Sequence, residues 1–261
     1  GLPNWMGGVA LGALTLTTLF FGFNKLVDIV GSIGPVVSIL AILLGIAGIM
    51  MNPGGLSTFT EQIGPLVESK TVLQAGSNWF MAMASYVGFC MLWLAVFMTN
   101  VGKNANSRRE AIYGTIFGAS LYSIEVLVLM LGLSANLVDV AGAQIPTLIL
   151  AKKIAPTLAV IYTIIVFVEI YTTAGPLIWT PVKRFAPDEK SNRYRILLLV
   201  LGVIGIVVGM NVQFDKLINV VYVINGYVGF ALFFLMVYTD IRVRILKNYT
   251  PNIVKELAAK K

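Results

Sequence analysis

The sequence predicts an all-α polytopic membrane protein with seven transmembrane helices, and three observations lead to this fold class. Of its 261 residues, 57% are hydrophobic and only 12% are charged, whereas soluble domains carry about 25% charged residues. Seven apolar stretches each approach the roughly 20 residues that a helix needs to cross a bilayer. The basic residues also lie mostly in alternate connections between these stretches, as is usual in membrane proteins.

The predicted spans are separated by connections of unequal length. Segment 52–76 is long, polar and rich in Gly, Ser and Thr, and we expect it to be an extracellular loop. Segment 136–154 is expected to hold a short helix at the membrane interface. The seven spans are predicted at residues 5–23, 29–51, 77–99, 112–134, 155–178, 195–213 and 217–239.

The distribution of Lys and Arg predicts the orientation of the chain. If the spans alternate in direction, 15 of the 19 Lys and Arg residues fall on one side of the membrane. The positive-inside rule places that side, with the basic tail 240–261, in the cytoplasm, and the first residues outside. The net charge of +7 is therefore interpreted as basic loops of a cell (inner) membrane protein in contact with lipid, and not as a nucleic-acid surface.

A short internal repeat separates two nearly equivalent stretches by 191 residues. Phe23–Val30 reads FNKLVDIV and Phe214–Val221 reads FDKLINVV, and each copy is expected to join two apolar segments. In the predicted topology the two copies lie on opposite sides of the membrane. A repeat that occurs once in each orientation is typical of secondary transporters.

If spans 5–51 correspond to spans 195–239, three further spans and roughly 115 residues are expected to precede this chain. The chain would then be helices 4–10 of two inverted groups of five. Residues 1–51 would end the first repeat, and residues 77–239 would form the second. The alternative is a true seven-span protein in which the repeat is a coincidence.

Two sequence segments carry a resemblance to a known family. They are Gly76–Trp79 continuing into Ser85–Gly88, and Glu169–Pro176. With these segments the chain resembles the YkvI-type membrane proteins of the leucine-transporter (LeuT) fold, in the amino acid–polyamine–cation superfamily. The resemblance implies a 5+5 inverted-repeat fold and transport of an amino acid or related solute.

The resemblance also implies particular site residues. Span 77–99 would be the sixth helix of the family, broken in mid-membrane, with a substrate site at Ser85, Tyr86, Val87, Gly88 and Phe89. The alternative is an ordinary helix whose small residues pack against a neighbour. Span 155–178 would be the eighth helix, where Thr172 and Thr173 would help to bind sodium. Alternatively, each hydroxyl bonds its own helix backbone.

Two carboxyl groups stand out without the resemblance. Glu125 and Glu169 are the acidic residues that fall deep within predicted spans, where a charge costs at least a few kcal/mol. They are candidates for coupling to sodium or a proton, with a structural role in joining helices as the alternative. Asn225 and Tyr227 place polar groups in the last span, where they would form an external gate or simply pack.

The predicted function is a secondary active transporter that moves a small solute by alternating access, with sodium or a proton as coupling ion. An enzyme is not expected, because the sequence has no His and no Asp deep in a span. A cofactor is not expected either. A non-transporting sensor or assembly protein of the same fold, or a seven-span receptor-like protein, remains the alternative. Oligomeric state and substrate are left open.

Overall fold

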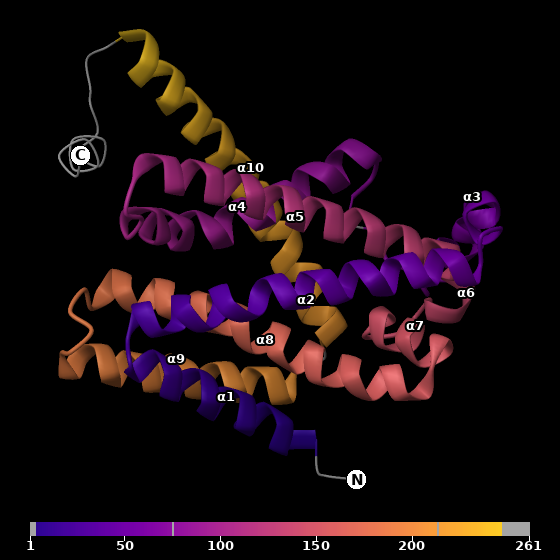
Figure 1. Ribbon diagram of the computed structural model, residues 1–261, viewed down its shortest axis with the longest axis horizontal. Coiled ribbons are helices and arrows are strands. Elements are labelled where there is room, and N and C mark those ends of the chain that lie inside the picture. The colour runs from indigo at the N-terminus through magenta and orange to yellow at the C-terminus, as the bar shows by residue number, and fades with distance from the viewer. Residues whose placement is uncertain (1–3, 75, 213, 247–261) are drawn as a thin grey trace. The chain divides into compact units, whose positions relative to one another are not determined.

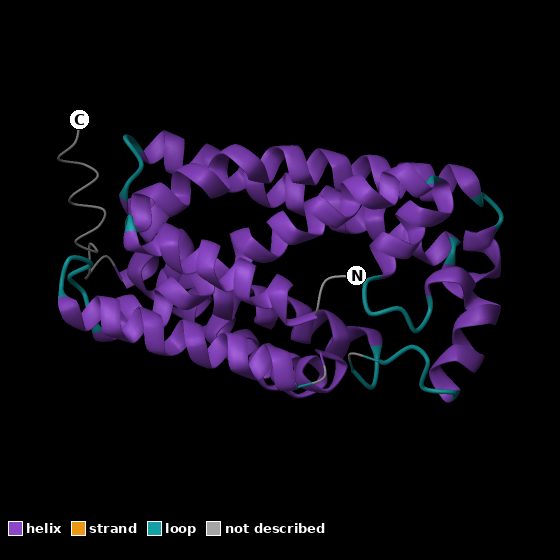
Figure 2. Cartoon of the chain, turned by 90° about the horizontal axis from the view of Figure 1, so that it is seen from below, coloured by secondary structure: helices purple, strands orange, loops and turns teal. Residues whose placement is uncertain are grey.

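The computed structural model describes residues 4–74, 76–212 and 214–246, and the regular structure in them is entirely helical (Figure 1). The long helices are α1 (Asn4–Phe20), α2 (Phe23–Met51), α4 (Trp79–Lys103), α5 (Arg108–Ala135), α8 (Pro156–Phe185), α9 (Asn192–Asn211) and α10 (Phe214–Leu246). Three shorter helices are α3 (Gly55–Glu68), α6 (Leu137–Val140) and α7 (Pro146–Ile154). Loops shown in teal join them (Figure 2).

The prediction of an all-α polytopic membrane protein is confirmed. Among the described residues, six helices are long and apolar enough to cross a membrane, namely α2, α4, α5, α8, α9 and residues 221–242 of α10. The apolar part of α1, Trp5–Phe20, is shorter. These seven helices match the seven predicted spans one for one.

Several boundaries differ from the sequence prediction. Helix α2 begins at Phe23 and not near residue 29, and α8 continues to Phe185, beyond the predicted end at 178. The added helical turns contain polar and charged residues such as Lys25 and Lys183, so a hydropathy criterion does not include them in a span. The expected interfacial helix in 136–154 is present as α6 and α7, and the polar segment 52–76 contains α3.

The sequence suggested that each copy of the internal repeat connects two apolar segments. In the structure neither copy does so. Phe23 is the first residue of α2 and Phe214 is the first residue of α10. Each copy therefore forms the first two turns of a long helix. The expectation that they are linking segments is wrong, but the two copies occupy equivalent positions in their helices.

The chain divides into two compact units. The first contains residues 1–73 and 120–214, with α1, α2, α8 and α9, and the second contains residues 74–119 and 215–261, with α4 and most of α10. Helix α5 contributes its first half to the second unit and its second half to the first. The predicted division into inverted repeats concerns internal symmetry and not compactness, so it stays a prediction.

In the first unit, polar contacts join helix ends that the seven-span topology requires on the same side. The loop after α8 meets the start of α2, where the Glu189 carboxylate accepts a hydrogen bond from the Phe23 N–H at 3.1 Å. At the far end of α2, the Asn52 side-chain amide donates to the Ala135 carbonyl at the end of α5 at 2.6 Å. Helices that run alternately up and down bring these ends to the same side of the membrane. The assignment of one side to the cytoplasm still rests on the Lys and Arg count.

Candidate ion and solute sites

The two carboxyl groups singled out in the sequence lie within electrostatic range of each other in the first unit. Glu125 on α5 and Glu169 on α8 are both half-buried and lie close enough for their charges to interact. The Tyr162 side chain, only 2% exposed, also lies within reach of both charges. The Thr147 side chain on α7 lies near the Tyr162 hydroxyl group.

Helix geometry explains why these groups share a face. Tyr162 and Glu169 are seven residues apart on α8, which is two helical turns. The Tyr162 ring is fixed in a buried cluster that also includes Leu44 of α2 and Leu150 of α7. Apolar packing therefore orients the face of α8 that carries Glu169.

The chemistry available to this carboxyl pair is cation or proton binding. Two half-buried carboxylates within electrostatic range repel, and a bound cation or a proton on one of them reduces that repulsion. Because the groups lie on separate helices, a cation or proton bound there would weaken the repulsion between the carboxylates of α5 and α8. Such a site can couple an ion to a change in helix packing.

The threonines predicted to hold sodium lie one turn further along α8. The Thr172 hydroxyl donates to the backbone carbonyl of Glu169 at 3.1 Å, which is the self-bonding alternative that the sequence left open. Its oxygen lone pairs stay available to an ion. Thr173 is exposed. The predicted sodium role of both residues stays a prediction.

The predicted break in the third span is absent. Helix α4 runs continuously from Trp79 to Lys103, through Ser85 and Gly88. Both residues are buried and form the contact with α10 in the second unit. The physical reason is that their small size serves close helix packing, which is the alternative that the sequence left open.

This α4–α10 contact is among the tightest in the described structure. A Cβ atom added at Gly226 would lie 2.8 Å from the Ser85 Cα. A Cβ atom at Gly88 would lie 2.5 Å from the Phe230 amide nitrogen and would overlap the Gly226 carbonyl oxygen. The two backbones meet directly, so only glycine fits at these positions.

The contact brings together two segments that the sequence suggested separately, the substrate segment Ser85–Phe89 and the gate segment Asn225–Tyr227. The Phe89 ring stacks on Tyr222 of α10, with centroids 3.9 Å apart and planes 14° apart. Asn225 is half-buried, and Tyr86 and Tyr227 are exposed by 42% and 50%. Val87 is half-buried on α4. The roles of these residues as solute ligands and gate stay predictions.

Sequence reasoning missed a polar cluster around Glu189, in the loop between α8 and α9. Its carboxylate accepts hydrogen bonds from the Phe23 N–H at 3.1 Å, the Trp179 indole N–H at 3.2 Å and the Lys183 ammonium at 3.0 Å. The Phe23 and Trp179 rings are in contact, with centroids 4.3 Å apart. The partners lie up to 166 residues apart in the chain, so no local pattern could have revealed the cluster.

The same cluster explains the turn between α1 and α2. Gly22 adopts a φ of +94°, and a Cβ atom there would lie 2.9 Å from the Glu189 carboxylate. Glycine therefore lets the chain turn and lets the carboxylate reach the first N–H groups of α2, where a negative charge is favoured. We name Glu189, Phe23, Trp179 and Lys183 the Glu189 clasp.

The clasp makes the stability of the fold depend on pH. Burial alone would raise the pKa of Glu189, but the hydrogen bonds from Phe23, Lys183 and Trp179 and the Lys183 charge together hold that pKa below its ordinary value of 4.5. A lowered carboxyl pKa stabilises the folded state at pH values above the ordinary value. That contribution is lost as the pH falls through 4.5 toward the lowered pKa.

We expect Glu189→Gln to lower the stability at pH 7 by about 1–2 kcal/mol, because charged hydrogen bonds are replaced by weaker neutral ones. The difference from the natural protein should shrink as the pH is lowered below 4.5. Thermal unfolding in detergent at a series of pH values measures both effects. Glu61→Gln, at an exposed position on α3, removes the same charge as a control. A stability difference that does not change with pH would contradict the assignment.

A second missed group joins α2, α5 and α7. The Asn136 side chain is 1% exposed, and its amide donates to the carbonyl oxygens of Gly48 and Gly132, both at 2.9 Å. Its own side-chain oxygen accepts from Lys153 at 3.1 Å, and Lys153 also pairs with Asp139. Asparagine directly after a long apolar helix was the available signal, because a buried amide needs several partners.

Comparison of the chain with protein-family models, with curated proteins and with solved structures found no match. The residues and their geometry are therefore the grounds for assigning a function.

Proposed function

We propose that this polytopic membrane protein belongs to a secondary active transporter of the LeuT fold, which moves an amino acid or related small solute by alternating access. The observation that carries the proposal is the pair Glu125 and Glu169. Placing two acidic groups within the membrane-spanning helices costs free energy, which favours a functional role for them. Together they can bind sodium or a proton.

Two further features support the transporter proposal. Both copies of the repeat begin a long helix, α2 in one case and α10 in the other, as equivalent fifth helices of two repeats would. The chain also divides into two compact units, with α1, α2, α8 and α9 in one and α4 and α10 in the other. A transporter that rocks one helix group against another needs separable groups of this kind.

In this proposal the carboxyl pair and the α4–α10 contact have different tasks. Sodium or a proton occupies Glu125 and Glu169, with Thr172 and Thr173 nearby on α8. The solute is bound near Tyr86 and Phe89, beside the α4–α10 crossing, with Asn225 and Tyr227 as gate residues. Ion binding relieves carboxylate repulsion and so favours the helix arrangement that binds solute, which couples the two by mass action.

A thermal-shift screen tests this proposal. The protein purified from its native membrane is unfolded in detergent with each of the common amino acids, with and without sodium, at pH 5.5 and pH 8. We expect a small group of chemically related solutes to raise the melting temperature only in the presence of the coupling ion. Saturation at 100 times the dissociation constant stabilises by about 2.7 kcal/mol.

The alternatives give different outcomes in the same screen. A solute that stabilises the protein equally under all ion conditions would indicate a sensor without coupling. If neither solutes nor ions change the melting temperature, the transporter proposal is contradicted.

A further inference from the structure

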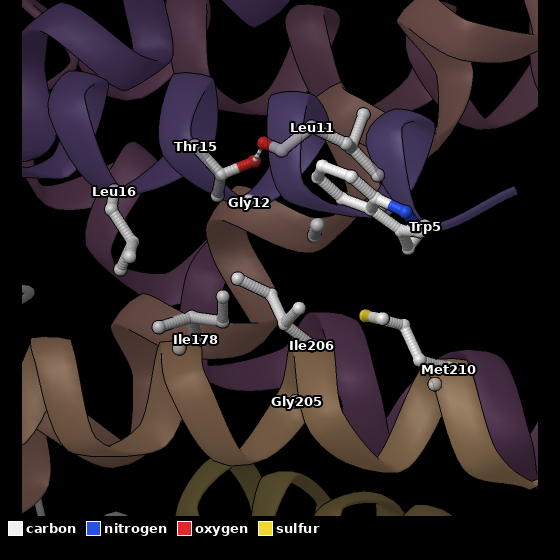
Figure 3. A pocket seen from close by; sticks show the side chains of 13 residues that line it. Trp5, Leu11, Gly12, Thr15, Leu16, Ile178, Gly205, Ile206 and Met210 are labelled. Atoms are coloured by element: carbon white, nitrogen blue, oxygen red, sulfur yellow. Dashed lines mark hydrogen bonds between the residues drawn. The ribbon is translucent and has the colours of Figure 1, made fainter. Parts of the chain in front are cut away.

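A second site, separate from the carboxyl pair, lies between α1, α8 and α9. It is a cavity of about 670 Å³, within the range typical of ligand-binding pockets. Figure 3 shows the side chains of Trp5 and Leu11 on α1 facing Ile206 and Met210 on α9 across it. Ala174 and Ile178 of α8 complete the lining.

Glycines build this cavity in two different ways. A Cβ atom at Gly12 would overlap the Ile206 side chain, and one at Gly202 would lie 2.5 Å from the Leu16 Cδ2 atom. These two glycines hold α1 and α9 in contact. Gly205 and Gly209 also line the cavity, but a Cβ atom at either would meet nothing within 4 Å. The space beside them is open.

The lining offers almost nothing to a polar ligand. Thr15 is 1% exposed, and its hydroxyl already donates to the Leu11 carbonyl at 2.9 Å (Figure 3). The Trp5 indole, 53% exposed at the start of α1, is the other side chain of the lining with a hydrogen-bonding group. An apolar cavity between apolar helices favours a hydrocarbon ligand.

The length and width of the cavity indicate which kind of hydrocarbon ligand it can hold. The α1 lining runs from Trp5 to Leu16, about 17 Å at 1.5 Å per residue, which is close to half of the roughly 30 Å hydrocarbon core. A further helix, about 10–12 Å in diameter, does not fit between α1 and α9, since these two already touch at Gly12 and Gly202. An extended acyl chain is narrow enough.

We propose that this groove binds one acyl chain of a membrane phospholipid, from the leaflet on the Trp5 side. The chain lies along Gly205 and Gly209, where the missing side chains leave room for it. Trp5 sits at the level of the headgroup, the depth that tryptophan prefers in membranes. The bound lipid then fills space between α1 and α9 that no protein side chain fills.

Native mass spectrometry of the detergent-purified protein tests this proposal. We expect the natural protein to retain one phospholipid per chain, and Gly205→Leu to lose it, because the leucine occupies the groove. Gly209→Leu, one turn further along α9, provides an independent second test. Gly118→Leu on α5 makes the same change in open space, at a residue that does not line the cavity, and should keep the lipid.

Three outcomes would overturn the proposal. The first is a natural protein that retains no phospholipid after mild purification. The second is equal retention by all three variants in the folded state. The third is an adduct with the mass of a free fatty acid or of a second protein chain in place of a phospholipid. Melting temperatures of the variants show that each is folded, and filling an open groove should not lower them.

Discussion

Glu169→Gln is expected to abolish the ion dependence of solute binding while the folded protein stays in the membrane. Glutamine has nearly the same shape as glutamic acid but carries no charge and cannot exchange a proton. An ion that couples to a solute typically changes its affinity by about 5–150-fold, and this factor should fall to one. The measurement is solute affinity by calorimetry, at low and high sodium and at two pH values.

The partner residue provides the internal check. Glu125→Gln should cause a similar loss, and the double variant should be little worse than either single one, because the two carboxyl groups act as one site. Glu68→Gln, at an exposed position at the end of α3, removes an equivalent charge elsewhere. Unchanged ion dependence in Glu169→Gln would remove the role that we assign to this residue.

Gly88→Ala is expected to separate α4 from α10 at their crossing point. The added Cβ atom would overlap the Gly226 carbonyl oxygen and lie 2.5 Å from the Phe230 amide nitrogen. Both are backbone atoms, so no side-chain rotation can relieve the overlap, and the helices must move apart. Overpacking costs about 1–3 kcal/mol, and we expect a value at the upper end because the obstacle is rigid.

Thermal unfolding in detergent measures this loss, and Gly102→Ala is the matched control on the same helix. A Cβ atom at Gly102 meets nothing within 4 Å, so the same substitution there should be neutral or slightly stabilising. If the two alanine variants unfolded at the same temperature, the close α4–α10 contact would be contradicted.

The membrane-spanning segments were largely predictable, because a long apolar stretch has few other stable environments. Helix ends were less predictable. The first turns of α2 contain Asn24, Lys25 and Asp28, which a hydropathy criterion excludes from a span. Such turns form because helical hydrogen bonds extend beyond the apolar region.

The candidate site shows the same division. Glu125 and Glu169 were identifiable as single residues, because acids within apolar stretches are rare, but their electrostatic interaction depends on where the fold places α5 and α8. Ser85 and Gly88 were misread as a helix break. Small residues suit both a break and a close crossing, and the decisive partner, Gly226, lies 138 residues further along the chain.

The Glu189 clasp could not be predicted from the sequence alone. An exposed loop carboxylate is ordinarily solvated, and nothing in its neighbours indicates three donors. Its role follows only from the positive φ of Gly22 and from the position of Trp179 on α8, both of which depend on the assembled helices.

Ion-driven accumulation of solute tests the central claim most directly. The protein from its native membrane is reconstituted into liposomes, and uptake of a radiolabelled amino acid mixture is followed under an imposed sodium gradient or pH gradient. Our account predicts accumulation above the external concentration under one of these gradients, and its loss when that gradient is collapsed. Uptake equal to that of protein-free liposomes under both gradients would contradict it.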